Sequence, residues 1–569
     1  MTDVRAEGDP PGDDPAPLTT DSNAEPSAEV ARSRDAEGAR MLRATAIMSV
    51  GTTLSRITGL LRLAAIGAAI GVAHSQIADA YNIANNTPNI VYELVLGGVL
   101  TSVFVPVFVE WLTKRGRDDA WEVARSVMTI TAVVLTGVAA LMILLAPVVI
   151  GLYTMNVPAG PERDAERELA TFFLHWFMPQ IVFYGVGAVA TGLLNAHRRF
   201  AAPMFAPILN NLIVIATMIV FVAIGPAATD IHAITTAQKY VLAIGTTLGV
   251  IGMTVALWPS LRALGFRFAW RWNWRNEAVR RIARLASWVL LYVVVNQLGL
   301  IVVIVLGTGE LNYSAYFNAF VLFSLPHAIF AVSVMTAVLP ALSAHWTNRE
   351  PSEFRALLAR GIRLTALIVI PAALGYLALA GPIAQLVFGH GVNTPASAAV
   401  VADVLRFFAI GLFPFSAFQL LLRAFYAQQD SRTPALVNVA AVAVNTALNF
   451  LFFGLFGVEG LALGYAAAYT FGSIVLAVLM RRRLGGLDGR NILPGLGKVL
   501  VAGLATAGAA YGASVVLGHL VGTATLLEQA VQVTGSVVVG LLVFGAMALL
   551  LRIEDLRQVV GMIAGRFRR

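Results

Sequence analysis

Long apolar stretches dominate the chain and are separated by short polar or basic segments. A membrane span needs about 20 apolar residues at about 1.5 Å rise per residue. Fourteen stretches reach that length, at 42–72, 76–112, 123–153, 168–195, 201–224, 239–261, 283–307, 311–343, 360–387, 397–427, 434–456, 459–480, 495–520 and 528–551. The pattern predicts an all-α polytopic membrane protein with about fourteen transmembrane helices.

Composition agrees with this interpretation. Hydrophobic residues make up 58% of the 569 positions and charged residues only 13%, whereas soluble domains are about a quarter charged. The chain has no cysteine, which excludes disulfides, thiolate metal sites and cysteine nucleophiles.

The pattern of basic residues predicts the orientation. If the N-terminus is cytoplasmic, the predicted inner loops and the C-terminal tail hold 29 of the 40 Lys and Arg residues, and the outer loops hold three. This positive-inside distribution predicts a multi-pass protein of the bacterial cytoplasmic (inner) membrane with both termini in the cytoplasm.

Three segments outside the spans have their own character. Residues 1–40 are rich in Pro, Asp, Glu and Ala and are predicted to form a disordered cytoplasmic tail, and 553–569 a basic cytoplasmic tail. Residues 265–284 interleave tryptophan with arginine, which predicts an interfacial amphipathic linker against anionic membrane lipids. Nucleic acid is not an expected partner, because no soluble nucleic-acid-binding module accompanies the segment.

The two halves of the chain resemble each other. "LLNAHRRFAAPMFAPILNN" at 193–211 is similar to "LLRAFYAQQDSRTPALVNV" at 421–439. We therefore predict an N-terminal six-helix lobe at 41–264, a C-terminal six-helix lobe at 285–484, and two additional helices at 485–552. Duplicated halves around a central site are typical of secondary transporters.

The second apolar stretch carries a polar stripe. At 100° per residue, one face collects Asp79, Asn82, Asn86, Asn89, Glu93 and Gly97. Polar groups in hydrocarbon are costly unless they find partners or face water, so the stripe predicts a cavity-lining face. The alternative is packing between helices through amide hydrogen bonds.

The first apolar stretch supplies positive charge. Ser55 and Arg62 share one face and Arg56 lies at its edge. An arginine at mid-bilayer costs roughly 2.5–3.5 kcal/mol on insertion scales, so it needs a partner or an anion. Asp79 and Glu93 are the candidate partners, and Arg56 has the alternative of extending to the inner surface.

Two further polar features lie in the second half. Arg406 is an intramembrane cation whose alternative role is pairing with Asp403. Asn445 and Asn449, four residues apart, present their side-chain oxygens on one face as a candidate cation site, with helix packing as the alternative.

No catalytic motif is present. The sequence lacks GxxxxGK[ST], HExxH and GxSxG, and its histidines are scattered. We expect a protein that is not an enzyme and needs no metal or organic cofactor.

Five blocks of the chain carry a family resemblance. In order, they are "SRITGLLRLAAIG", "ADAYNIANNTPNIVYELVLGGVLTSVFVPVF", "RRFAAPMFAPILNN", "LPHAIFAVSVMTAVLPALS" and "LLRAFYAQQDSRTPALVN". Together they resemble the MurJ/MviN family, the lipid II flippases of bacterial peptidoglycan synthesis, over about 42–550. The resemblance implies the MOP exporter fold, with two lobes about a central cavity and a groove for the polyprenyl tail formed with the last two helices.

The resemblance also implies a function. Lipid II, the undecaprenyl-pyrophosphate-linked disaccharide-pentapeptide, would move from the inner to the outer leaflet by alternating access. The drive would be a coupling ion (Na⁺ or H⁺) or the membrane potential, and cell-wall synthesis proteins are candidate partners. The alternatives are a drug/cation or polysaccharide-unit exporter of the same superfold, and a non-transporting scaffold for cell-wall machinery.

By position, the residues that match cavity positions of the family are Ser55, Arg56, Arg62, Asp79 and Asn89. Three positions depart from the family. Leu63 replaces an acid, Tyr92 replaces a cavity arginine, and Val321 falls near the place of another arginine. The resemblance therefore implies two cavity arginines here instead of four, with Arg406 as a candidate replacement.

Overall fold

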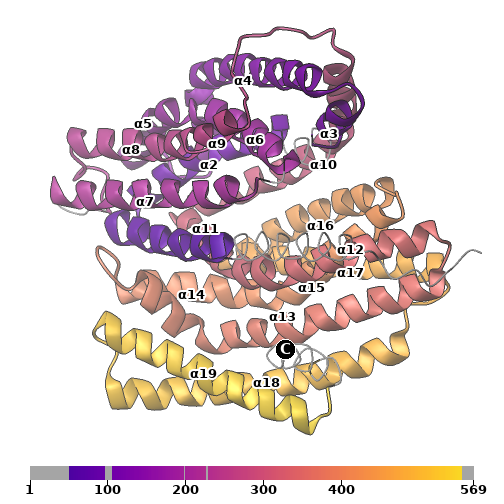
Figure 1. Cartoon of the computed structure of the whole chain (residues 1–569). Helices are drawn as coiled ribbons and strands as arrows, with labels where there is room; N and C mark the ends of the chain where they lie inside the picture. Colours follow the sequence, from indigo (N-terminus) through magenta and orange to yellow (C-terminus); the bar gives the residue numbers. More distant parts are fainter. Residues whose placement is uncertain (1–49, 97–104, 198, 226–228, 554–555, 557–569) are drawn as a thin grey trace, which may run out of the picture.

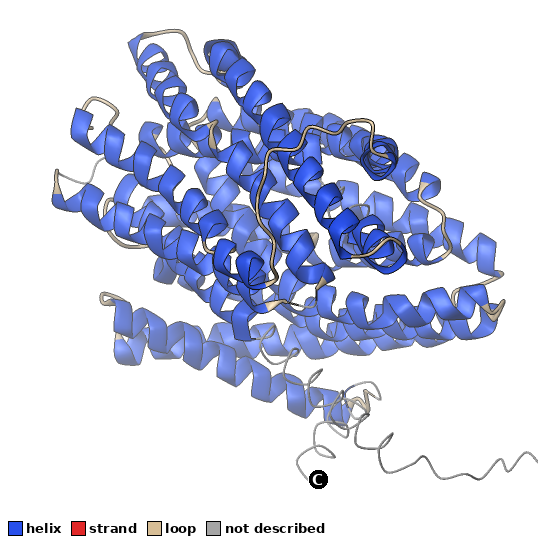
Figure 2. Cartoon of the chain, turned by 45° about the horizontal axis from the view of Figure 1, so that its top comes forward, coloured by secondary structure: helices blue, strands red, loops and turns tan. Residues whose placement is uncertain are grey.

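The computed structural model describes residues 50–96, 105–197, 199–225, 229–553 and 556. The predicted N-terminal tail, Gly97 and nearly all of the predicted C-terminal tail lie outside these residues. Within the described residues all regular structure is helical (Figure 2), as the apolar pattern predicts.

The helices follow one another with short connections. In chain order they are Val50–Ile70, α2 Gln76–Leu96, α3 Val105–Lys114, α4 Arg117–Tyr153, α5 Pro161–Phe177, α6 Gln180–Ala196, α7 Ala201–Ala223, α8 Thr236–Val255, α9 Trp258–Ala263, α10 Glu277–Thr308, α11 Tyr313–Pro326, η2 His327–Ala331, α12 Val332–Thr347, α13 Pro351–Phe388, α14 Pro395–Ile410, α15 Leu412–Ala427, α16 Arg432–Phe456, α17 Val458–Leu484, α18 Gly489–Val521 and α19 Leu526–Leu550.

Most of the predicted spans are confirmed. In the described ranges, eleven helical segments are long and apolar enough to cross a membrane, and the pair α14–α15, bent by 47°, makes a twelfth. The polar helix α2 and the helix α10 occupy the places of the second and seventh predicted spans. The predicted number of fourteen is therefore approximate.

The helices gather into an upper and a lower group. In Figure 1, α2–α9 form the upper part, α11–α17 lie below them, and α18 and α19 run along the lower edge. Two buried apolar clusters lie mainly in the upper group and a third lies mainly in the lower group. A smaller cluster, including Ile370, Val499 and Ala548, attaches α18 and α19 to α13.

The linker between the two groups is an extended connection. No helix forms between Leu264 and Glu277, and Trp270, Trp272 and Trp274 are each more than half exposed. The connection arches over α4 (Figure 1). Two hydrogen bonds hold it there: Nε of Arg125 donates to the carbonyl of Arg267 at 2.9 Å, and the Arg271 N–H donates to Oγ1 of Thr129 at 3.1 Å. Exposed indole rings suit a membrane interface.

Candidate substrate cavity

Asp79 joins α2 to the N-terminus of α11. Its Oδ1 atom accepts a hydrogen bond from the Ser314 N–H at 2.8 Å and a second one from Oγ of Ser314. The N-terminal end of a helix carries partial positive charge and favours a carboxylate. Asp79 is fully buried in this contact, so it is not an exposed cavity group, and the residue that hydrogen-bonds to it is Ser314.

Two amides of the predicted stripe bind the same turn of α11. Nδ2 of Asn82 donates to Oγ of Ser314 at 2.9 Å, and Nδ2 of Asn86 donates to the phenol oxygen of Tyr313 at 3.0 Å. The first half of the stripe therefore connects the two lobes. This is the packing role of amides that the sequence left open.

Backbone contacts reinforce this connection. The Val392 N–H donates to the carbonyl of Ala68 at 3.1 Å, and Nδ2 of Asn393 donates to the carbonyl of Gly67 at 2.8 Å. We call the contacts of residues 67–86 with 311–314 and 391–393 the outer gate, because the predicted orientation places these loops outside.

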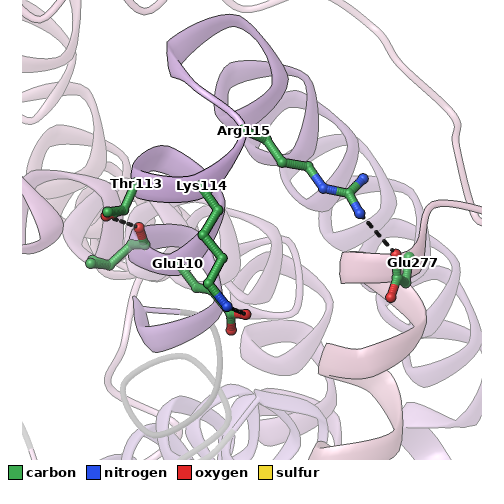
Figure 3. Close-up of polar contacts among 6 residues, drawn as sticks. Glu110, Thr113, Lys114, Arg115 and Glu277 are labelled. Carbon is green, nitrogen blue, oxygen red and sulfur yellow. Dashed lines mark hydrogen bonds and ion pairs between the residues drawn. The ribbon is translucent and has the colours of Figure 1, made fainter. Parts of the chain in front are cut away.

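The opposite end of the molecule shows a weaker link. Figure 3 shows Arg115, just before α4, pointing to Glu277 at the start of α10, with Nη2 and Oε2 3.3 Å apart. Both side chains are more than half exposed, and exposed ion pairs are worth about 0–1 kcal/mol. The link is therefore easier to break than the buried outer gate.

A polar pocket surrounds Arg62. Its volume is about 190 Å³, and its polar lining consists of Arg62, Tyr81, Asn85, Asn89, Tyr184, Asn210 and Thr246. The Nε atom of Arg62 is buried and has no hydrogen-bond partner. A buried donor without an acceptor is costly, and an anionic ligand supplies one. The predicted combination of Arg62 with Asn89 is thus present in the structure.

A second pocket lies between the lobes. It has a volume of about 210 Å³ and receives residues from α2, α10, α11, α16 and α17. Its polar and aromatic lining consists of Asn86, Asn296, Tyr313, Tyr316, Phe317, Phe320, Asn445, Tyr465 and Tyr469. Aromatic rings and amides together suit the apolar faces and hydroxyl groups of a sugar.

Several predicted site residues lie outside these two pockets. Ser55 is half-buried and its backbone carbonyl accepts a hydrogen bond from Nδ2 of Asn211 at 3.3 Å. Arg56 and Glu93 are exposed. Neither is brought together with Arg62 in its pocket, so their role in binding stays a prediction.

Arg406 forms an ion pair with Asp403, one turn away on α14. This is the alternative role that the sequence allowed. Its side chain is 44% exposed and lines neither pocket, so the structure does not place Arg406 where a missing cavity arginine would act.

Asn445 and Asn449 bind each other. Nδ2 of Asn445 donates to Oδ1 of Asn449 at 3.3 Å, and Nδ2 of Asn449 donates to Oδ1 of Asn445 at 3.2 Å. A Cβ atom at Gly464 would lie 2.2 Å from Oδ1 of Asn449, so α17 packs closely on this pair. The contacts are those of helix packing, the alternative to a cation site.

The three departures from the family are accommodated locally. Leu63 is buried in the apolar cluster of the C-terminal lobe. The ring of Tyr92 lies 5.7 Å from that of Tyr184, a lining residue of the Arg62 pocket. Val321 packs against the same cluster as Leu63.

Some lining residues of the Arg62 pocket were not predicted from the sequence. Tyr184, Asn210 and Thr246 come from three different helices of the N-terminal lobe, α6, α7 and α8. Of these three, only Asn210 could have been predicted as a site residue, because it is a polar residue in an otherwise apolar stretch.

The fold and the site define a class: a two-lobed membrane transporter of the MOP superfamily fold with a basic, amide-lined pocket. Solved structures support the fold. A structure titled lipid II flippase MurJ, inward closed conformation, matches with a TM-score of 0.70 at 20% identity, over 89% of this chain and 98% of that chain. An inward-facing multidrug resistance MATE family transporter of the MOP superfamily matches with a TM-score of 0.63 at 14% identity, over 76% and 95%.

The sequence comparisons are more specific. The family model "Lipid II flippase MurJ" matches residues 66–531. The lipid II flippase MurJ of Burkholderia cenocepacia is 29% identical over 452 residues, which cover 78% of this chain and 84% of the relative. The probable lipid II flippase MurJ of Vibrio cholerae is 28% identical over 534 residues, which cover 91% and 98%. The chain belongs to the MurJ family of lipid II flippases.

Proposed function

We propose that this protein moves lipid II from the inner to the outer leaflet of the cytoplasmic membrane by alternating access. Its family and the names of its relatives support this substrate. The observation that carries the proposal for the site is the pocket around Arg62, which combines an unsatisfied guanidinium donor with amides inside an apolar protein.

The chemistry of the head group fits this pocket. Arginine binds phosphate through two parallel N–H···O bonds and keeps its charge at any physiological pH. We assign the diphosphate to Arg62, and sugar or peptide groups to Asn85, Asn89 and the aromatic pocket between the lobes. The polyprenyl tail stays in lipid or along the outer surfaces of α18 and α19, which expose many large apolar side chains.

The two ends of the molecule suit alternating access. The outer gate is closed by buried hydrogen bonds, whereas the Arg115–Glu277 pair at the other end is exposed. An inside-negative potential favours outward movement of an anion by roughly 2.3 kcal/mol per charge per 100 mV, so the head group itself supplies part of the drive. This direction requires both termini to be cytoplasmic, as the charge pattern predicts.

Replacement of Arg62 tests the proposal. Arg62→Ala is expected to fail to support growth of a flippase-depleted strain, with lipid II accumulating in the inner leaflet while the protein still reaches the membrane. Arg62→Lys is expected to rescue only in part, because lysine lacks the planar fork of donors.

Arg406→Ala is the matched control. It removes another intramembrane arginine, but one that pairs with Asp403 and lines neither pocket, so it is expected to support growth. Normal growth of Arg62→Ala would contradict the assignment of the diphosphate.

A further inference from the structure

Glu166 is a buried acid that the proposed function does not use. It lies on α5 and is 0% exposed. Neither of its two carboxylate oxygens has a hydrogen-bond partner. An ionised carboxylate held in this way is very costly, and burial normally neutralises such a group by protonation.

The position of Glu166 follows from the packing of α5 beside α2. Nε2 of Gln76 donates to Oε2 of Glu162 at 2.7 Å, and the ring of Tyr81 lies 5.9 Å from that of Phe173. The two helices therefore lie side by side, and both begin at the same end of the molecule. One turn further in than Glu162, the carboxyl group of Glu166 comes close enough to Asp79 for their charges to repel each other.

Like Glu166, Asp79 has a buried carboxylate oxygen that lacks a hydrogen-bond partner. Its Oδ1 atom accepts hydrogen bonds from Ser314 at the start of α11, but its Oδ2 atom is buried without a partner. Asp79 of the outer gate thus has a second buried carboxyl group, that of Glu166, behind it on α5, and only one oxygen of the four accepts a hydrogen bond.

Two arginines of α5 flank Glu166. The Nε atom of Arg163, one turn before it, lies 3.5 Å from Oδ1 of Asp164 in an ion pair. Arg167, on α5 itself, acts on Glu166 electrostatically, but its Nε atom donates to Oγ1 of Thr154 at 2.7 Å, at the end of α4. At this end α4 also contributes the buried phenol of Tyr153. From α8 the charged group is Lys239, on the first turn.

Two adjacent buried carboxyl groups do not both ionise, because like charges repel strongly away from water. The donors of α11 and the partial positive charge at its N-terminus stabilise the anion at Asp79. We propose that Glu166 is a proton-binding site of this protein and that it carries a proton whenever the outer gate is closed.

The proposal couples protons to the gate. When α11 moves away from Asp79, both carboxyl groups reach the outer aqueous phase and Glu166 releases its proton there as it ionises. When the gate closes, Glu166 takes up one proton from the same side. Closing of the gate is therefore favoured by acid outside, which goes beyond the transport of lipid II proposed above.

The absence of cysteine from the chain makes the gate directly measurable. Ala159→Cys and Ala396→Cys place one thiol at an exposed position on each lobe near the gate. With spin labels on both, the distance distribution of the full-length protein in lipid nanodiscs is followed from acid to alkaline pH. The short-distance, closed population is expected to fall as the pH rises.

Two variants identify the group that titrates. Glu166→Gln mimics the protonated acid and is expected to keep the closed population constant over the whole pH range. Glu162→Gln changes an exposed carboxyl one turn away and is expected to titrate like the parent protein. A parent protein insensitive to pH, or a Glu166→Gln variant that titrates like the parent, would overturn the proposal.

Infrared difference spectroscopy gives an independent readout. The closed protein at neutral pH is expected to show the C=O band of a protonated carboxyl group, which Glu162→Gln retains and Glu166→Gln loses. If Glu166→Gln does not fold, Glu166→Asp keeps a titratable carboxyl and should shift this band instead. An unshifted band in Glu166→Asp would contradict the assignment. These measurements contain no lipid II, so their failure is distinguishable from failure of the proposed transport function.

Discussion

The guanidinium of Arg62 and the carboxyl of Asp79 show how much a residue's role depends on its distant neighbours. Both were predicted to face one cavity. Arg62 lines a polar pocket together with Asn89, whereas Asp79 is bound by Ser314, 235 residues further along the chain. The stripe that contains Asp79 is visible in the sequence, but its partner on α11 is not.

A second carboxyl group, outside the spans, gives a pH prediction. Burial opposes ionisation of Asp430, but hydrogen bonds from Thr433 and Arg483 outweigh burial and hold the pKa of this carboxyl below its ordinary value. The Arg483 Nη2 atom lies 2.8 Å from Oδ2 of Asp430. The ionised group therefore stabilises the fold above the pKa of an unfolded aspartate, and this stability is lost as the pH falls through the lower, folded value.

Asp430→Asn is expected to lower the thermal unfolding midpoint at neutral pH. The difference from the parent protein should shrink as the pH falls below about 4, where the parent carboxyl also becomes neutral. Asp119→Asn, which removes an exposed carboxyl at the start of α4, is the control for the change in net charge. A difference that stays constant with pH would contradict the role of the ion pair.

At the scale of helices, the ends of elements are specified locally. Helix α19 begins with a capping box, in which Oγ1 of Thr525 accepts from the Glu528 N–H at 3.3 Å and the Glu528 carboxylate accepts from the Thr525 N–H at 3.1 Å. Thr525 and Glu528 are only three positions apart, so the sequence by itself predicts that a helix begins here. The bend of 47° between α14 and α15 also has local signals. Gly411 lies at the break, and Pro414, in the first turn of α15, cannot donate a backbone hydrogen bond to the last turn of α14.

Thr525→Ala tests the cap. Loss of the side-chain acceptor leaves backbone N–H groups of the first turn unsatisfied and is expected to cost about 1 kcal/mol of stability. The measurement is the unfolding midpoint of the purified protein in detergent. Thr525→Ser keeps the hydroxyl group and should be close to the parent. Equal midpoints for the alanine and serine variants would show that the cap does not contribute.

At the scale of the whole molecule, the outer gate depends on a close approach of two backbones. Gly391 has a φ angle of +70°, and a Cβ atom there would lie 2.0 Å from the carbonyl oxygen of Ala68 in the other lobe. Only glycine combines this backbone conformation with so close a contact. The gate therefore requires a residue without a side chain at this position.

Gly391→Ala is expected to shift the protein away from the closed outer gate, as read from spin-label distances between the lobes. Gly485→Ala is the matched control, because Gly485 has a φ angle of +69° and a Cβ atom added there would meet nothing within 4 Å. It carries the same backbone strain without the contact between lobes. Equal distances in the two variants would contradict the steric role of Gly391.

The sequence by itself determined the membrane class, the helices and the family, because span length, apolar composition and block order are local properties of the chain. It also indicated Arg62 and Asn89, since a cation and amides in apolar helices require an explanation wherever the helices pack. Only the tertiary structure decided that Asp79, Asn82 and Asn86 bind α11 and that Arg406 lines neither pocket. It also placed Glu166 without a partner beside Asp79. These roles depend on which helices are neighbours, and burial between helices far apart in sequence sets both the partner and the charge of each group.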